Sequence, residues 1–248
     1  MTQIATTLPD VLVGPLLRRL SPSRLILWLV ATRPLTMLLV LNPEQEEQQT
    51  HALDNAHQCV AIGRHAYIHC IDLSLPTALP TDTRIAYDLQ VQSTDGAWQP
   101  LPEWAPWLCH DDYDYPGFVL ASRHHRLMHG SCRKPHHDSA DGLVRADNWI
   151  AERQESPTEW PAWLLMTGDQ IYADDVAGPM LRAIHQLIDR LGLYEETLTG
   201  SSVSDSKTLR ENADTYFHRE KLLPDVRSNE ALIERFFGGV RKPVFTTA

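Results

Sequence analysis

Short apolar segments separated by turn-forming residues fill the first half of this chain and restrict the folds open to it. Pro, Asn, Asp and Gly punctuate the segments, and helical periodicity is weak between them. Strands of this length, bounded by turn residues, indicate two antiparallel sheets packed face to face. We predict strands over residues 11–19, 24–31, 35–41, 59–72 and 84–92. The polar segment 42–57 is expected to be a loop or a short helix at the rim.

The second half shows a different pattern, in which apolar strands alternate with helical segments. Strands are predicted at 126–129 and 163–167, and helices at 141–153, 179–191, 207–222 and 229–237. Such alternation indicates an α/β layer. A Pro-, Trp- and Asp-rich segment at 100–116 reads as a linker, so we place a boundary near residue 120. The expected fold is an immunoglobulin- or fibronectin-like β-sandwich over 1–120, followed by a partial α/β domain over 121–248.

The composition of the chain restricts the kinds of partner that it can bind and the compartment that it fits. The chain has 248 residues, of which 43% are apolar, and this suffices for a sizeable core. Its net charge of −10 argues against nucleic acid as the main partner, because phosphate backbones attract basic surfaces. A small phosphorylated substrate is still compatible with that charge. The four cysteines form no C-x-x-C pair, which favours neither a zinc ribbon nor a disulfide scaffold and fits a reducing compartment.

The N-terminal region superficially resembles an export signal, since Arg18-Arg19 precedes the apolar run 25–31. That run is short, and Arg33-Pro34 interrupts it. A membrane span needs roughly twenty uninterrupted apolar residues. The sequence therefore predicts neither a signal nor a membrane span here, and we expect a cytoplasmic protein.

An apolar strand at residues 163–167 runs directly into a group of oxygen ligands, and this acidic loop covers residues 168–175. Gly168 lets the backbone turn as the strand ends, and Asp169, Tyr172 and Asp174 follow. Carboxylate and phenol oxygens are donors that hard cations prefer. Strand ends are where α/β proteins build chemistry. The alternative to a metal-binding role is that these residues form a polar loop that caps the following helix.

A second loop, the cysteine loop at residues 130–135, also follows an apolar strand with a glycine. If the two strands are neighbours, both loops lie at the same sheet edge. Cys132, Asp169 and Tyr172 would then form a pocket for a strongly Lewis-acidic ion, with Asp174 available to a second one. Two ions about 3.5 to 4 Å apart clamp a phosphoryl oxygen and activate water. The sequence thus predicts phosphate-ester hydrolysis.

With these motifs the chain resembles the PhoD-like alkaline phosphatases of the calcineurin-like metallophosphoesterase superfamily. The resemblance lies in Gly14-Pro15-Leu16-Leu17-Arg18-Arg19 followed by Trp28, in the cysteine loop, and in Gly168-Asp169-Gln170-Ile171-Tyr172-Ala173-Asp174. It implies that Asp169 bridges two metal ions, that Cys132 and Tyr172 bind Fe3+, and that Asp174 contributes to a neighbouring Ca2+ site. We expect Arg133 to orient the phosphate of a small ester substrate.

Family members complete their metal shell with an Asp-Asp-His or Asn-His element and with late histidine motifs. The sequence after Asp175 contains no such motif. We therefore expect the N-terminal portion of a longer phosphatase, a truncated form without the downstream ligands. The alternative is a catalytically inert remnant whose sandwich domain binds a partner or ligand. The sequence does not indicate an oligomeric state.

Overall fold

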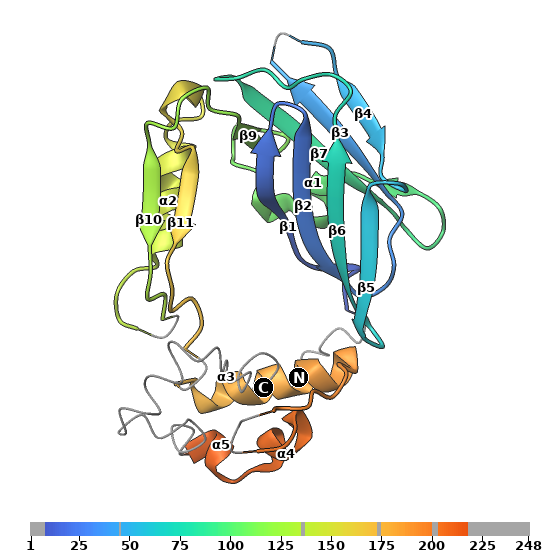
Figure 1. The fold of residues 1–248 in the computed structure, drawn as a ribbon, viewed down its shortest axis with the longest axis vertical. Coiled ribbons are helices and arrows are strands. Elements are labelled where there is room, and N and C mark those ends of the chain that lie inside the picture. The colour runs from blue at the N-terminus through green and yellow to red at the C-terminus, as the bar shows by residue number, and fades with distance from the viewer. Residues whose placement is uncertain (1–7, 45, 135–136, 173–174, 200–202, 218–248) are drawn as a thin grey trace. The chain divides into compact units, whose positions relative to one another are not determined.

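The structure is a computed structural model that describes residues 8–44, 46–134, 137–172, 175–199 and 203–217. The chain forms two compact units (Figure 1). The first unit contains the described residues of 1–62, 66–131 and 139–167, and the second contains those of 63–65, 132–138 and 168–248. Most of the regular structure is β-sheet, with few helices. The domain boundary near residue 120 stays a prediction.

Two antiparallel sheets form the larger part of the first unit, as far as the chain is described (Figure 1). One sheet has the order β1-β2-β6-β5, with strands Val11–Ser21, Arg24–Ala31, Ala66–Ser74 and His57–Gly63. The other has the order β4-β3-β7-β8, with strands Gln49–Ala52, Met37–Pro43, Arg84–Gln92 and Trp98–Gln99, and β9 (Gly117–Val119) also pairs with β7.

Alternating apolar residues give both sheets a buried face. Every second residue of β2 is buried, because successive side chains of a strand point to opposite faces. The shared core draws on both sheets and includes Leu25, Leu27, Leu29, Met37, Leu39, Leu41, Ile71, Ile85 and Leu89. Two antiparallel sheets over one core are compatible with the predicted β-sandwich.

Two local predictions in this region are wrong. The single strand expected over 59–72 is a hairpin, in which Arg64 and His65 form the turn between β5 and β6. The amide of Arg64 donates to Gly192 O at 3.0 Å, and that of His65 donates to Leu191 O at 2.8 Å. These partners are far away in the sequence, so local pattern could not reveal the turn. The segment 42–57 contains strand β4, a short polar edge strand paired with β3.

The glycine at position 14 has a backbone role. Gly14 lies in β1 with φ +93°, and a Cβ atom there would lie 2.7 Å from the carbonyl oxygen of Trp28. Leu16 pairs with Trp28 across the two strands. A close backbone approach therefore explains both the glycine and its association with Trp28.

A parallel strand pair follows in the first unit. β10 (Leu127–Gly130) pairs with β11 (Trp163–Met166), and the chain between them forms α2 (Gly142–Ala151). Asp141 caps α2, because its Oδ1 accepts the amide of Leu143 at 2.9 Å. The strand–helix–strand order agrees with prediction. Within the described ranges, however, no metallophosphoesterase α/β domain is shown, since only these two strands pair in parallel.

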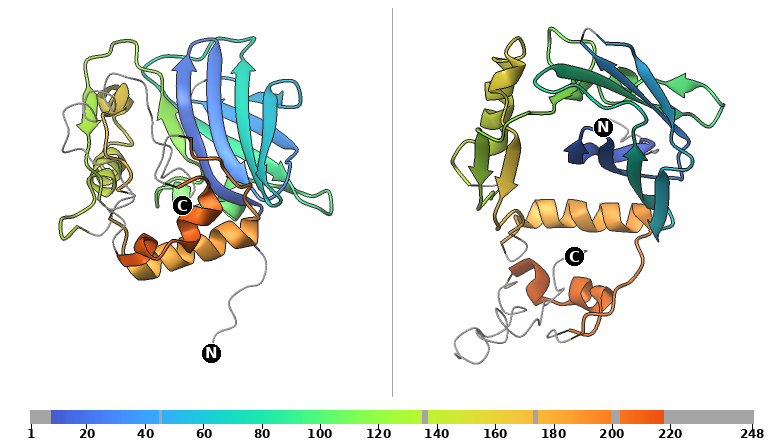
Figure 2. Two further views of the ribbon diagram at one scale, coloured as in Figure 1. Left: turned by 60° about the horizontal axis from the view of Figure 1, so that its bottom comes forward. Right: turned by 45° about the horizontal axis from the view of Figure 1, so that its top comes forward.

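The second unit is helical. α3 (Gly178–Leu191) confirms the predicted amphipathic helix, and Gly192 ends it in a left-handed conformation. The helix expected over 207–222 is instead two short helices, α4 (Ser206–Glu211) and α5 (Asp214–Phe217), and residues 229–237 lie outside the described residues. Both views of Figure 2 show α4 and α5 beside α3. In the described part of the chain, no helix has the length and apolar character that crossing a bilayer requires.

Candidate functional site

Residues 132–134 of the cysteine loop lie beside residues 168–172 of the acidic loop in the second unit. Each loop begins just after a strand, β10 or β11, that pairs with the other in parallel. The amide of Cys132 donates to Gly168 O at 3.0 Å, and the amide of Arg133 donates to Asp169 O at 2.9 Å. Two segments that are far apart in the sequence are thereby held in fixed register. The condition that the two strands be neighbours is met.

The backbone at the two predicted metal ligands is left-handed. Cys132 has φ 55° and Asp169 has φ 51°, and Gly168 beside it has φ 147°. Non-glycine residues adopt this region infrequently, and cysteine has no local hydrogen bond that favours it as Asp does. Strained backbone of this kind concentrates at functional sites. No sequence pattern indicates a left-handed backbone at Cys132.

The side chains of these two residues meet. Cys132 Sγ donates a hydrogen bond to Asp169 Oδ2 at 3.3 Å. Hydrogen bonding with Cys132, partial desolvation, and the negative charges of Cys132 and Asp169 raise the pKa of Tyr172 to about 12. A thiol, a carboxylate and a phenol therefore share one hydrogen-bonded cluster. Cys132 and Asp169 are exposed, so ions and small solutes can reach them.

Arg133 and Asp174 are the other two predicted site residues. The backbone amide of Arg133 joins the two loops. Lys134 Nζ forms an ion pair with Asp175 and lies 5.9 Å from the centre of the Tyr172 ring. Asp174 lies outside the described residues. Two basic residues therefore flank the cluster in sequence, and one ammonium group lies close to its phenol.

The donor set of the cluster suits a metal ion. Thiolate sulfur, carboxylate oxygen and phenolate oxygen together favour a strongly Lewis-acidic transition ion over Mg2+ or Ca2+, which prefer oxygen alone. Each of the three groups is acidic, and each is hydrogen-bonded to another member of the cluster. A cation could replace the shared protons and hold the same three atoms.

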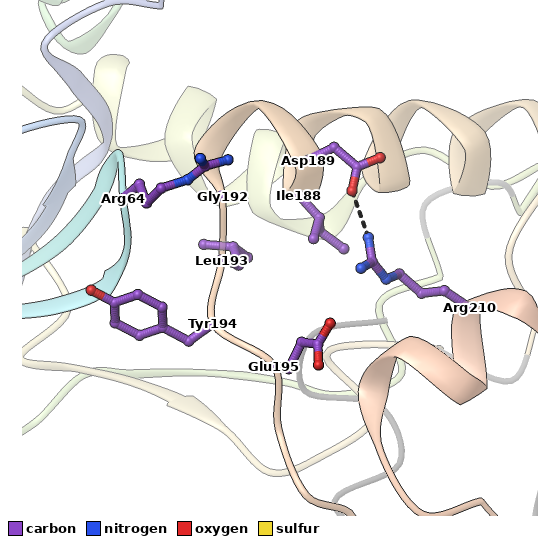
Figure 3. A pocket seen from close by; sticks show the side chains of 8 residues that line it. All are labelled: Arg64, Ile188, Asp189, Gly192, Leu193, Tyr194, Glu195 and Arg210. Carbon is purple, nitrogen blue, oxygen red and sulfur yellow. Dashed lines mark hydrogen bonds and ion pairs between the residues drawn. The ribbon is translucent and has the colours of Figure 1, made fainter.

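A pocket of about 510 Å3 also lies in the second unit (Figure 3). It is formed around the C-terminal end of α3, and Arg210 of α4 bonds Asp189 across it at 2.7 Å. The described residues that line it are Arg64, Ile188, Asp189, Gly192, Leu193, Tyr194, Glu195 and Arg210. The predicted site residues do not line this pocket.

A second group of metal-binding side chains lies in the first unit. His57 and Cys59 of β5 and His69 of β6 form a His–Cys–His cluster that could hold a metal ion, with one ligand atom from each residue within 4.8 Å of the others. Sequence pattern does not predict this cluster, because it indicates one strand over 59–72 and the cluster depends on the hairpin found there. The sequence signal for this cluster is the spacing of His57 and Cys59, because residues two apart lie on the same face of a strand.

Comparison with protein-family models gives no match to this chain, and comparison with curated proteins gives none either.

Proposed function

We propose that this chain hydrolyses small phosphate esters with the help of metal ions held by Cys132, Asp169 and Tyr172. The observation that supports the proposal best is the 3.3 Å contact between Cys132 Sγ and Asp169 Oδ2. It joins side chains from two loops that each follow a strand of one parallel pair. Both residues have left-handed backbones there. Such a conformation costs conformational free energy, and strain of this kind concentrates at functional sites.

Each residue has a proposed role. Cys132 and Tyr172 would bind Fe3+, Asp169 would bridge that ion to a second one, and Asp174 would contribute to a Ca2+ site. When bound, the two cations would clamp a phosphoryl oxygen and lower the pKa of a water molecule toward about 7. Arg133 would orient the phosphate, since a guanidinium can donate two hydrogen bonds to phosphate oxygens.

The resemblance to the PhoD-like phosphatases supports the same reaction. In this proposal residues 121–248 form part of a metallophosphoesterase α/β domain, and the β10–β11 pair would be two of its strands. The four free cysteines support a cytoplasmic location, because disulfides are rare there.

Hydrolysis of a chromogenic phosphate ester by the purified chain, supplied with Fe3+ and Ca2+, tests the proposal. We expect Asp169→Asn to lower kcat/KM by at least about 100-fold, because it removes the charge that would hold both cations. Asp112→Asn is a matched control, since Asp112 is an exposed carboxylate in a different loop. Its activity should equal that of the wild type.

An inert chain, or equal activity in wild type and Asp169→Asn, would overturn the proposal. The first outcome would favour the alternative that the sandwich binds a partner and the remainder is catalytically silent. Tyr172→Phe should also lose activity, whereas Tyr194→Phe, at a residue that is 55% exposed, should not.

A further inference from the structure

We propose that the His–Cys–His cluster of His57, Cys59 and His69 is a zinc site at the edge of the sandwich, separate from the acidic loop. The ligands are two imidazoles and one thiol. This combination favours a borderline-soft transition ion and disfavours Ca2+ or Mg2+. Zinc takes such ligands with no redox requirement.

The strands fix the three side chains in place. His57 and Cys59 are two residues apart in β5, so they lie on the same face of the strand. β6 is the neighbour of β5 in the sheet, and it contributes His69. Because paired strands are rigid relative to loops, the three ligands need little ordering when an ion arrives.

The distances are close to those that a metal needs. His57 Nε2 lies 2.6 Å from His69 Nδ1, and the three residues offer ligand atoms that all lie within 4.8 Å of one another. Two nitrogens bound tetrahedrally at about 2.0–2.1 Å from zinc lie about 3.3 Å apart. The two rings, whose planes differ by 11°, therefore need to separate by less than 1 Å, which side-chain rotation can supply.

His69 is held in the tautomer that a ligand requires. Its ring is fully buried, and its Nε2 lies 3.2 Å from the carbonyl oxygen of Arg33. Donation from Nε2–H to this oxygen leaves Nδ1 with a free lone pair, and Nδ1 is the atom nearest His57. Histidine ligands are commonly oriented by such a bond to a backbone carbonyl.

Nearby charges also suit a cation. Asp54 attracts positive charge at His57. The guanidinium of Arg33, which would oppose a cation, is paired with Asp10 Oδ2 at 2.6 Å and donates to Gln92 O at 2.7 Å. Cys59 is exposed, so it provides an entry path and room for a water as fourth ligand.

Zinc binding to the full chain tests this site. The measurement is zinc retained per chain after chelation, reloading and gel filtration, together with Co2+ substitution, in which a bound thiolate gives a near-ultraviolet charge-transfer band. We expect one zinc per chain in a Cys132→Ser/Asp169→Asn background, where the acidic loop is disabled. In this background, His57→Ala and Cys59→Ser should each weaken zinc binding by at least about 100-fold.

Cys70→Ser is the matched control, because Cys70 adjoins His69 in β6 and lies on the opposite face of the strand. It should keep both the zinc and the Co2+ band. Cys59 is exposed, so its serine variant should fold normally, and circular dichroism checks this. No zinc in the background protein would mean that His57 and His69 form a hydrogen-bonded pair only, and would overturn the site. Zinc affinity in Cys59→Ser and His57→Ala that equals the affinity of the background protein would overturn it as well. Loss of phosphatase activity has no bearing on either result.

Discussion

Cys132 and Asp169 are the residues at which local conformation and proposed chemistry coincide. Both have positive φ, and their side chains meet at 3.3 Å. The left-handed region costs a non-glycine residue roughly 1–2 kcal/mol. Glycine would avoid that cost but would lack the thiol. The presence of cysteine at this position is therefore best explained by what its sulfur contacts.

This cost gives a prediction for stability. Cys132→Gly should be more stable than Cys132→Ala by about 1 kcal/mol, because both variants lose the thiol and only glycine relieves the left-handed strain. Urea denaturation of the two variants measures the difference. Equal stability, or a more stable alanine variant, would contradict a strained backbone at this residue.

Asp205 gives a prediction for pH dependence. Hydrogen bonds from Ser204 Oγ, and from the amide and hydroxyl of Thr208, lower the pKa of Asp205 to about 2. The folded-state pKa lies below the unfolded value of about 3.9, so the ionised carboxylate stabilises the fold above about pH 4. That contribution is lost as the pH falls toward 2.

The stability gap between wild type and Asp205→Ala should thus be constant from about pH 7 to 5 and should shrink below about pH 4. Urea unfolding across this range measures the gap. Ser204→Ala removes the largest cause of the lowered pKa, so in that background the gap should be smaller at pH 7 and its loss should be complete at a higher pH. A stability gap that does not change with pH would refute the stabilising role of the ionised Asp205 carboxylate.

At the scale of elements, the end of α3 depends on one glycine. Gly192 has φ +58°, and a Cβ atom there would lie 2.6 Å from Arg64 Nε. Gly192→Ala should lower the free energy of unfolding by roughly 1–2 kcal/mol, because alanine disfavours the left-handed cap. Thermal or urea denaturation measures this change.

The matched control is Gly178→Ala at the start of the same helix, where an added Cβ meets no atom within 4 Å. This variant should be neutral or slightly stabilising, since alanine has the higher helix propensity. If both variants lose the same stability, the cap geometry of Gly192 is not the cause.

The elements that the sequence predicts well are those with a strong internal pattern. β2 (Arg24–Ala31) and β7 (Arg84–Gln92) have the predicted bounds, and α3 begins one residue earlier than predicted. Elements whose position depends on contacts with residues far away in the sequence were not predicted. The turn at Arg64 and His65 is held by carbonyl groups at 191 and 192, and edge strand β4 has too polar a sequence to stand out.

The two candidate metal sites differ in how far a local sequence pattern reveals them. The acidic loop is contiguous, so Gly168, Asp169 and Tyr172 could be read from one stretch of sequence. The His–Cys–His cluster depends on a hairpin, and its members come from two strands. Local spacing in the sequence does not encode which strands pair. The cluster is therefore recognised only in the three-dimensional structure.

At the scale of the whole molecule, charge bears on both sites. A net charge of −10 attracts cations and repels phosphate esters over the range of a Debye length. Capture of metal ions is thereby favoured at low ionic strength. Binding of an anionic substrate needs local positive charge, which the bound metal ions, Arg133 and Lys134 would provide.

The central claim is that Cys132, Asp169 and Tyr172 hold a metal ion together, and Fe3+ binding followed by visible absorption tests it most directly. Thiolate and phenolate ligands both transfer charge to Fe3+ in visible light, so the wild-type chain should bind one equivalent of Fe3+ and become coloured. Cys132→Ser and Tyr172→Phe should each change or lose the band, and Asp169→Asn should lower the Fe3+ affinity by at least about 100-fold. An uncoloured wild-type protein, or the same spectrum and affinity in all three variants, would contradict the account.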